Sequence, residues 1–359
     1  MRPWEKLPRA WAALGAVAWA ALWAFPSAKA AEIQLIERLL LLAPFVTVPL
    51  ALLATARAAA GDARPRPVLW RAACVVGPPA AALLAASLRL LPGRTAGALA
   101  APWIATTGIL ALLGLQRRLR GGVARALVPF EEACIDAGHA YLAIGGAWLA
   151  IERFGLAVLG FGPTIALLTA VHFHYAGFAA PIIAGLAGRT LLAGAGAAAG
   201  TAAGPASTSA SAAASSPASA SAPAPSPRLR RAYFAAAGAV ALGPPLIAAG
   251  ITVSPLLEVA AAFALAAGLL LFCALLVLRV APALGRAGHP VARALLTLAG
   301  AALVVTMAAA CAYALGEFQG RVYLGIPRMA EIHGAANALG FSLGGLAAFA
   351  IVRPGPRAR

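Results

Sequence analysis

The sequence predicts an all-α fold: a polytopic transmembrane helical bundle. Three observations support this: 62% of the residues are hydrophobic, 11% are charged, and apolar runs alternate with short arginine-bearing segments along the 359 residues. Soluble domains carry about 25% charged residues, so this composition is typical of the membrane class. The apolar runs are continuous, whereas the strands of a transmembrane barrel alternate apolar and polar residues.

Ten apolar segments are candidate spans. They are residues 10–26, 33–56, 68–90, 95–115, 137–152, 163–188, 232–252, 255–278, 290–313 and 329–352. The fifth is the weakest, because a helix between Asp136 and Glu152 rises only about 22 Å against a hydrocarbon core of about 30 Å. We expect a short span beside tilted neighbours, or a re-entrant segment, at this place.

The basic residues predict the orientation of the spans. If all ten segments cross, one set of alternate connections holds 21 of the 28 lysines and arginines and the other holds 7. This bias places the richer set and both termini in the cytoplasm. The net charge of +17 is spread singly between apolar segments. It therefore indicates contact with the lipid bilayer and its headgroups rather than with nucleic acid.

One low-complexity segment divides the chain. Residues 193–227 are rich in Ala, Ser, Pro and Gly, which predicts a disordered cytoplasmic linker between a six-span half (1–192) and a four-span half (228–359). Residues 1–31 also fit a cleavable signal peptide, although their tryptophans and apolar length favour a retained helix. No internal repeat is evident, which disfavours an inverted-repeat transporter architecture.

Histidines inside apolar segments are the first candidate site, because an ionisable group at this depth costs about 2.5–3.5 kcal/mol on insertion scales. His172 and His174 are two apart in V-H-F-H-Y, so a regular helix points them about 200° apart. Pro181 removes a backbone hydrogen bond and loosens the turn before it, which can change that geometry. His333 and Asn337 are four apart and share a helix face.

Depth connects these two segments. His172 lies about 13 Å and His333 about 6 Å from the outer ends of their spans. We therefore expect an outward-facing polar pocket, made by side chains from several spans. Its predicted members are His172 or His174, Tyr175, His333, Asn337, and Glu258 or Glu317.

A second candidate lies on the cytoplasmic side. Glu132, Asp136 and His139 recur at i, i+4 and i+7, so they line one stripe of a helix. Asp136 and His139 can relay protons or bind a cation. More often, acidic residues at a helix start are caps and partners of the helix dipole.

Four motifs resemble those of the YndJ-like family of bacterial integral membrane proteins. They are V-H-F-H-Y-A-G-F, the preceding L-G-F-G-P-T-I-A-L-L-T-A, D-A-G-H-A-Y-L-A-I-G-G-A-W-L and H-G-A-A-N-A-L-G-F. The resemblance covers most of the membrane region and not the linker. It implies a multi-pass protein of the bacterial cytoplasmic (inner) membrane, and it implies no reaction. The motif positions that it implies are Asp136, Trp148, His172, His174, Tyr175, His333 and Asn337.

Three functions are compatible with these residues. The first is a transporter or permease of a small solute, with histidines that titrate near neutral pH as proton carriers. The alternative is an intramembrane enzyme or redox protein that holds a metal ion or haem on His172, His174 and His333, with Glu258 or Glu317 as base or fourth ligand. The third is a membrane scaffold or sensor. The substrate and the oligomeric state are not indicated by the sequence.

Overall fold

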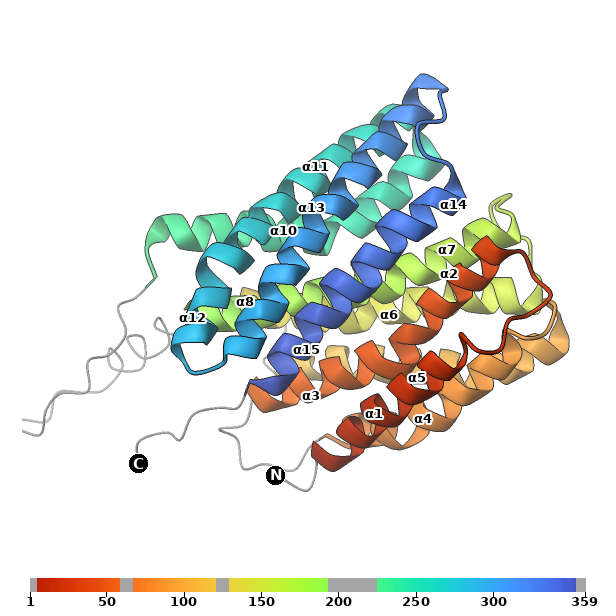
Figure 1. The fold of residues 1–359 in the computed structure, drawn as a ribbon, viewed down its shortest axis with the longest axis horizontal. Coiled ribbons are helices and arrows are strands. Elements are labelled where there is room, and N and C mark those ends of the chain that lie inside the picture. The colour runs from red at the N-terminus through yellow and green to blue at the C-terminus, as the bar shows by residue number, and fades with distance from the viewer. Residues whose placement is uncertain (1–4, 59–66, 121–128, 193–224, 353–359) are drawn as a thin grey trace, which may run out of the picture.

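The computed structural model describes residues 5–58, 67–120, 129–192 and 225–352. These residues form a bundle of long helices joined by short loops (Figure 1), which confirms the predicted all-α architecture. Nine of the described helices are long and apolar enough to cross a membrane. Nearly all of the predicted linker, 193–227, lies outside the described residues.

Six helical segments precede the predicted linker. They are α1 (Lys6–Ala21); α2 (Ala31–Leu42), continued by the π-helical turn η2 (Ala43–Thr47) and by α3 (Val48–Ala58); α4 (Val68–Ser87); α5 (Arg94–Leu119); α6 (Phe130–Phe154); and α7 (Pro163–His172), continued by η4 (Phe173–Ala179) and α8 (Ala180–Leu192).

Four helical segments follow it. They are α10 (Pro227–Val253); α11 (Pro255–Leu275), continued by η5 (Leu276–Val280) and α12 (Ala281–Arg286); α13 (Pro290–Gln319); and α14 (Ile326–Met329), continued by η6 (Ala330–Gly334), η7 (Ala336–Leu343) and α15 (Gly344–Ile351).

The fifth predicted span is longer than expected. Helix α6 has 25 residues and rises about 37 Å, which is enough to cross the hydrocarbon core. It begins after Pro129 and ends at Gly155, whose φ of 70° is the left-handed conformation that terminates many helices. The predicted span, 137–152, began after Asp136, whereas α6 begins at Phe130 and includes Glu132 and Asp136, because arginines of neighbouring helices pair with both carboxylates.

The first predicted span, 10–26, forms the short helix α1. Its 16 residues rise about 24 Å, less than a membrane core, and α1 is outside the group of nine described above. Two glycines let α1 pack closely: a Cβ at Gly15 would lie 2.0 Å from the Phe45 carbonyl oxygen, and one at Gly77 would lie 2.1 Å from the Trp11 ring. Small residues allow such backbone approach in membrane bundles.

Two continuous helices form the centre of the bundle. Helix α2–η2–α3 is 94% buried over its apolar window and α7–η4–α8 is 72% buried, against 28–39% for α10, α11 and α13. Helix α14–α15 lies between α13 and the centre, since it packs against α13, α3 and α8. Large apolar side chains on the outer helices face outward, such as Leu14, Leu278 and Leu298. These surfaces contact the lipid bilayer.

The connections gather at two ends of the bundle. Helices α3, α8, α12 and α15 finish at one end, where α10 begins (Figure 1), and we call it the arginine-rich end because Arg117, Arg118 and Arg189 lie there. The opposite end carries the α1–α2, α6–α7 and α13–α14 connections. Successive spans therefore run in opposite directions.

Candidate functional site

The structure brings His172 and His333 together. His172 ends α7 and His333 lies in η6, and their rings stack with centroids 6.1 Å apart and planes inclined by 28°. The two residues are separated by 161 positions in sequence and lie on either side of the predicted linker. We call them the histidine pair.

Each ring of the histidine pair uses one nitrogen. Nδ1 of His172 lies 2.7 Å from the Leu168 carbonyl oxygen, and Nδ1 of His333 lies 2.9 Å from the Thr306 carbonyl oxygen. A carbonyl only accepts, so both Nδ1 atoms donate and, in the neutral rings, both Nε2 atoms carry a lone pair. Neither Nε2 has a hydrogen-bond partner among the described residues. The pair therefore offers two acceptor nitrogens to a proton or a ligand.

His174 lies elsewhere, with both ring nitrogens satisfied. It is fully buried, its Nδ1–H donates to the Ala170 carbonyl at 2.7 Å, and its Nε2 accepts the Trp103 indole N–H at 3.2 Å. The π-helical backbone of η4 does not turn His174 toward His172. The expected three-histidine metal set is thus not assembled, and no group of three His, Cys, Asp or Glu residues suited to a metal ion occurs in the described part of the chain.

Two other predicted pocket residues make local contacts. The Tyr175 hydroxyl donates to the Leu39 carbonyl at 2.5 Å and so joins η4 to α2. The Asn337 side chain accepts from the Ser342 hydroxyl at 3.4 Å within η7. Neither residue has a hydrogen bond to the histidine pair among the described contacts.

Glu258 and Glu317 form a separate acidic region. They lie at the start of α11 and near the end of α13, close enough to each other and to Tyr313 to interact electrostatically. No described contact joins either carboxylate to the histidine pair. Of the predicted pocket members, His172 and His333 are the two that the described contacts bring together.

At the arginine-rich end, the predicted carboxylates are held by arginines. Glu132 forms a bidentate ion pair with Arg189, at 2.5 and 2.7 Å, and contacts Arg117 at 2.6 Å. Asp136 lies 2.9 Å from the Nε atoms of Arg117 and Arg118. These pairs tie α5, α6 and α8 together.

The third member of that stripe, His139, does not join the ion pairs. It is buried, its Nδ1–H donates to the Ile135 carbonyl at 2.8 Å, and its ring packs edge-on against Phe178. No hydrogen bond links it to Asp136 among the described contacts. The arrangement favours a structural role over a proton relay.

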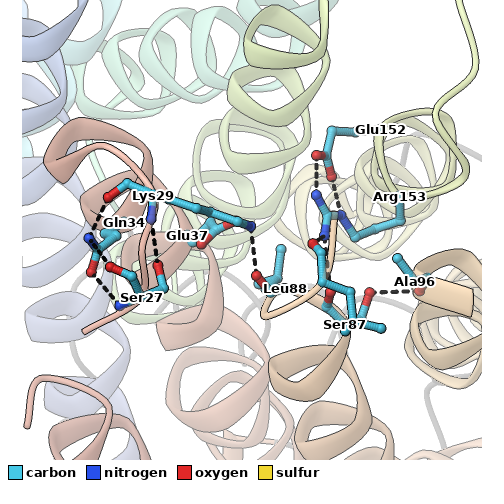
Figure 2. A network of polar contacts seen from close by, with 10 residues as sticks. Ser27, Lys29, Gln34, Glu37, Ser87, Leu88, Ala96, Glu152 and Arg153 are labelled. Carbon is cyan, nitrogen blue, oxygen red and sulfur yellow. Dashed lines mark hydrogen bonds and ion pairs between the residues drawn. The ribbon is translucent and has the colours of Figure 1, made fainter. Parts of the chain in front are cut away.

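Sequence reasoning missed a buried charged network at the opposite end (Figure 2). Arg153, which is 1% exposed, pairs with Glu152 and donates to the Ser87 and Leu90 carbonyls at 3.1 and 3.3 Å. Lys29 pairs with Glu37 and donates to the Leu88 carbonyl at 2.7 Å. Together these groups bind the end of α4 to α2 and α6. One feature of the sequence could have indicated this network: basic residues are scarce at this end, so Lys29 and Arg153 stand out.

The histidine pair lies beside irregular helix geometry. His172 directly precedes η4, and His333 lies within η6. Three of the five described π-helical segments, η2, η4 and η7, contact one another inside the bundle. π-Helical turns are rare and frequently mark functional sites. This observation adds independent weight to the pair as the candidate site.

The fold and the site define a polytopic helical membrane protein whose early and late helices meet at two histidines. The chain belongs to the YndJ-like protein family, whose model matches residues 38–341. This match confirms the family that the sequence motifs indicated.

A curated relative is the uncharacterized membrane protein YndJ of Bacillus subtilis (strain 168). It is 33% identical over 213 residues, which are 59% of this chain and 32% of that protein. The match thus spans about a third of the relative's length. No solved structure matches the chain.

Proposed function

We propose that this chain is a permease for a small solute in which the histidine pair couples proton uptake to helix movement. The observation that carries the proposal is the stacking of His172 on His333 with an uncommitted Nε2 on each ring. A histidine can gain and lose a proton near neutral pH. The pair thus has the chemistry that a proton-coupled carrier needs.

Protonation of both rings supplies the driving force. Two positive charges 6.1 Å apart repel by about 3 kcal/mol at an effective dielectric constant of about 20. Separation of α14–η6 from α7 relieves this repulsion, while a single proton does not create it. The neighbouring charges of Arg328 and Glu331 form an ion pair at 2.6 Å, so they neutralise each other.

The π-helical turns are the proposed joints. They interrupt the regular hydrogen bonding of α7–α8 and α14–α15 beside the pair. Movement at these turns alters the contact between the helices and leaves the arginine-rich end fixed by its ion pairs. A metal- or haem-dependent enzyme is less well supported, because only two of its three expected ligands lie together.

The proposed topology follows from charge. The arginine-rich end faces the cytoplasm of a bacterial cell, which places both termini and the linker 193–227 there and the histidine pair in the outer half of the inner membrane. On this proposal, residues 1–192 and 228–359 are two membrane halves that meet at the pair.

Reconstituted protein tests the proposal. Proteoliposomes containing a pH-sensitive dye receive pools of amino acids, sugars and carboxylates in turn, and the internal pH is followed. We expect one pool to cause a pH change that H172Q and H333Q each reduce by at least about tenfold. The matched control is H289Q, at the start of α13 and far from the pair. Wild-type rates in H172Q and H333Q would reject the histidine mechanism.

A further inference from the structure

A small cavity opens at the end of the bundle opposite the arginine-rich end. It lies between the loop after α1, the first turns of α2 and the end of α4, and it encloses about 30 Å³. That volume holds about two waters, and the cavity is open on one side. Its walls combine apolar side chains, such as Leu22 and Leu41, with the charged groups of Arg38 and Arg89.

The two arginines carry uncompensated charge. Arg38 donates to the Gln34 side chain at 3.4 Å and covers the Trp23 ring at 4.5 Å, and Arg89 donates to the Phe25 carbonyl at 2.5 Å. Among the described residues, neither guanidinium forms an ion pair with a carboxylate. Each guanidinium has five N–H donors, so most remain available to a ligand.

The carboxylate in the cavity wall does not supply that compensation. Glu37 lines the cavity, yet it is paired with Lys29, which also donates to the Leu88 carbonyl (Figure 2). The pair is neutral as a unit. The cavity therefore has a net charge of about two positive units, which favours an anion.

The loop between α1 and α2, which closes the cavity, is held in place by hydrogen bonds to the Gln34 side chain. The Gln34 amide donates to the Ser27 and Lys29 carbonyls at 3.0 and 2.7 Å and accepts the Ser27 N–H at 3.0 Å (Figure 2). The Ser27 hydroxyl oxygen accepts the Lys29 N–H at 3.4 Å, which leaves the hydroxyl proton for a ligand. These contacts order the site before a ligand arrives.

We propose that this cavity binds a phosphate group through Arg38, Arg89 and Ser27. A tetrahedral phosphate presents oxygens to two guanidinium groups at once, and arginine binds phosphate with paired hydrogen bonds. Arg38 is seven residues into α2 and Arg89 two residues beyond α4, so the site lies about 10 Å or less from the helix ends. That is the depth of lipid headgroups, and Trp23, whose ring Arg38 covers, is of a residue type enriched at this level.

Binding to the full-length protein in detergent tests the proposal. Thermal-shift titrations use three probes at constant ionic strength: phosphatidylglycerol, glycerol phosphate and inorganic phosphate. We expect saturable stabilisation by at least one probe, with an apparent Kd that R38Q and R89Q each raise by about tenfold or more. The matched control is R94Q, an exposed arginine at the same end that does not line the cavity, whose Kd stays within about twofold.

Each outcome has one meaning. Binding of phosphatidylglycerol alone supports a lipid headgroup as the source of the phosphate, and competition by inorganic phosphate supports a soluble source. The absence of saturable binding by all three probes overturns the proposal. An equal loss in R94Q also overturns it, because the effect is then one of general surface charge. R89Q keeps the test valid if R38Q fails to fold, since Arg89 is exposed.

Discussion

His172 and His174 stand two residues apart, yet they serve different purposes. His174 is fully buried, and both of its ring nitrogens form hydrogen bonds. His172 is exposed, forms a hydrogen bond through one nitrogen and stacks on His333. One ring completes the packing of α5 against η4, and the other faces a helix from the far end of the sequence. A shared motif thus does not imply a shared site, and the partner of each nitrogen distinguishes them.

Of the changes that test this comparison, removal of His174 should cause the largest loss of stability. In H174A, the Trp103 N–H loses its acceptor inside the bundle and a cavity remains, so we expect the protein to lose about 3 kcal/mol of stability. H172A should lose less than about 1 kcal/mol, since that ring is exposed. Unfolding in mixed detergent, followed by circular dichroism, measures both. Equal losses in the two variants would contradict the assigned roles.

The packing around His174 gives a second, intermediate effect. A Cβ at Gly145 would lie 2.8 Å from Nδ1 of His174, so G145A should destabilise the protein by about 1–3 kcal/mol through overpacking. The control is G108A, where nothing lies within 4 Å of the added Cβ. That change should be neutral or stabilise α5 by up to about 1 kcal/mol. The same unfolding assay applies, and a stable G145A would show that His174 can move.

The smallest effect is the coupling within the histidine pair. A double-mutant cycle of H172A and H333A should give an interaction energy of about 0.5–1 kcal/mol, the lower part of the range expected for stacked rings. The cycle of H174A and H333A should give about zero within 0.5 kcal/mol, because His174 bonds to Trp103 and Ala170 and no described contact joins it to His333. A coupling in the second cycle that equals the first would mean that the pair is not a distinct contact.

The sequence predicted the bundle well because burial in lipid imposes a simple rule on length and hydropathy. It also predicted that His172 and His333 reach similar depth, since helical rise converts residue count into distance. It did not predict the length of α6. In the sequence, Glu132 and Asp136 mark a charged segment before the apolar run. In the fold, Arg117 and Arg189 from other helices pair with these carboxylates, so the helix continues through them.

The sequence also did not predict which way each polar side chain points, because its partner lies on another helix. His174 is satisfied by Trp103, 71 positions earlier, and Arg153 by the Ser87 carbonyl, 66 positions earlier. Such partners depend on how the helices pack, and no local pattern encodes them. The phosphate cavity is similar, because Arg38 and Arg89 meet only after α1, α2 and α4 assemble.

The ion pairs of Glu132 have a consequence for biosynthesis. Arg117 precedes Glu132 in the chain and Arg189 follows it by 57 residues. During translation, α6 therefore enters the membrane with Arg117 already made, while Arg189 has still to leave the ribosome. Its arrival with α8 completes the cluster, so the early helices can lock together before any of the later ones are synthesised.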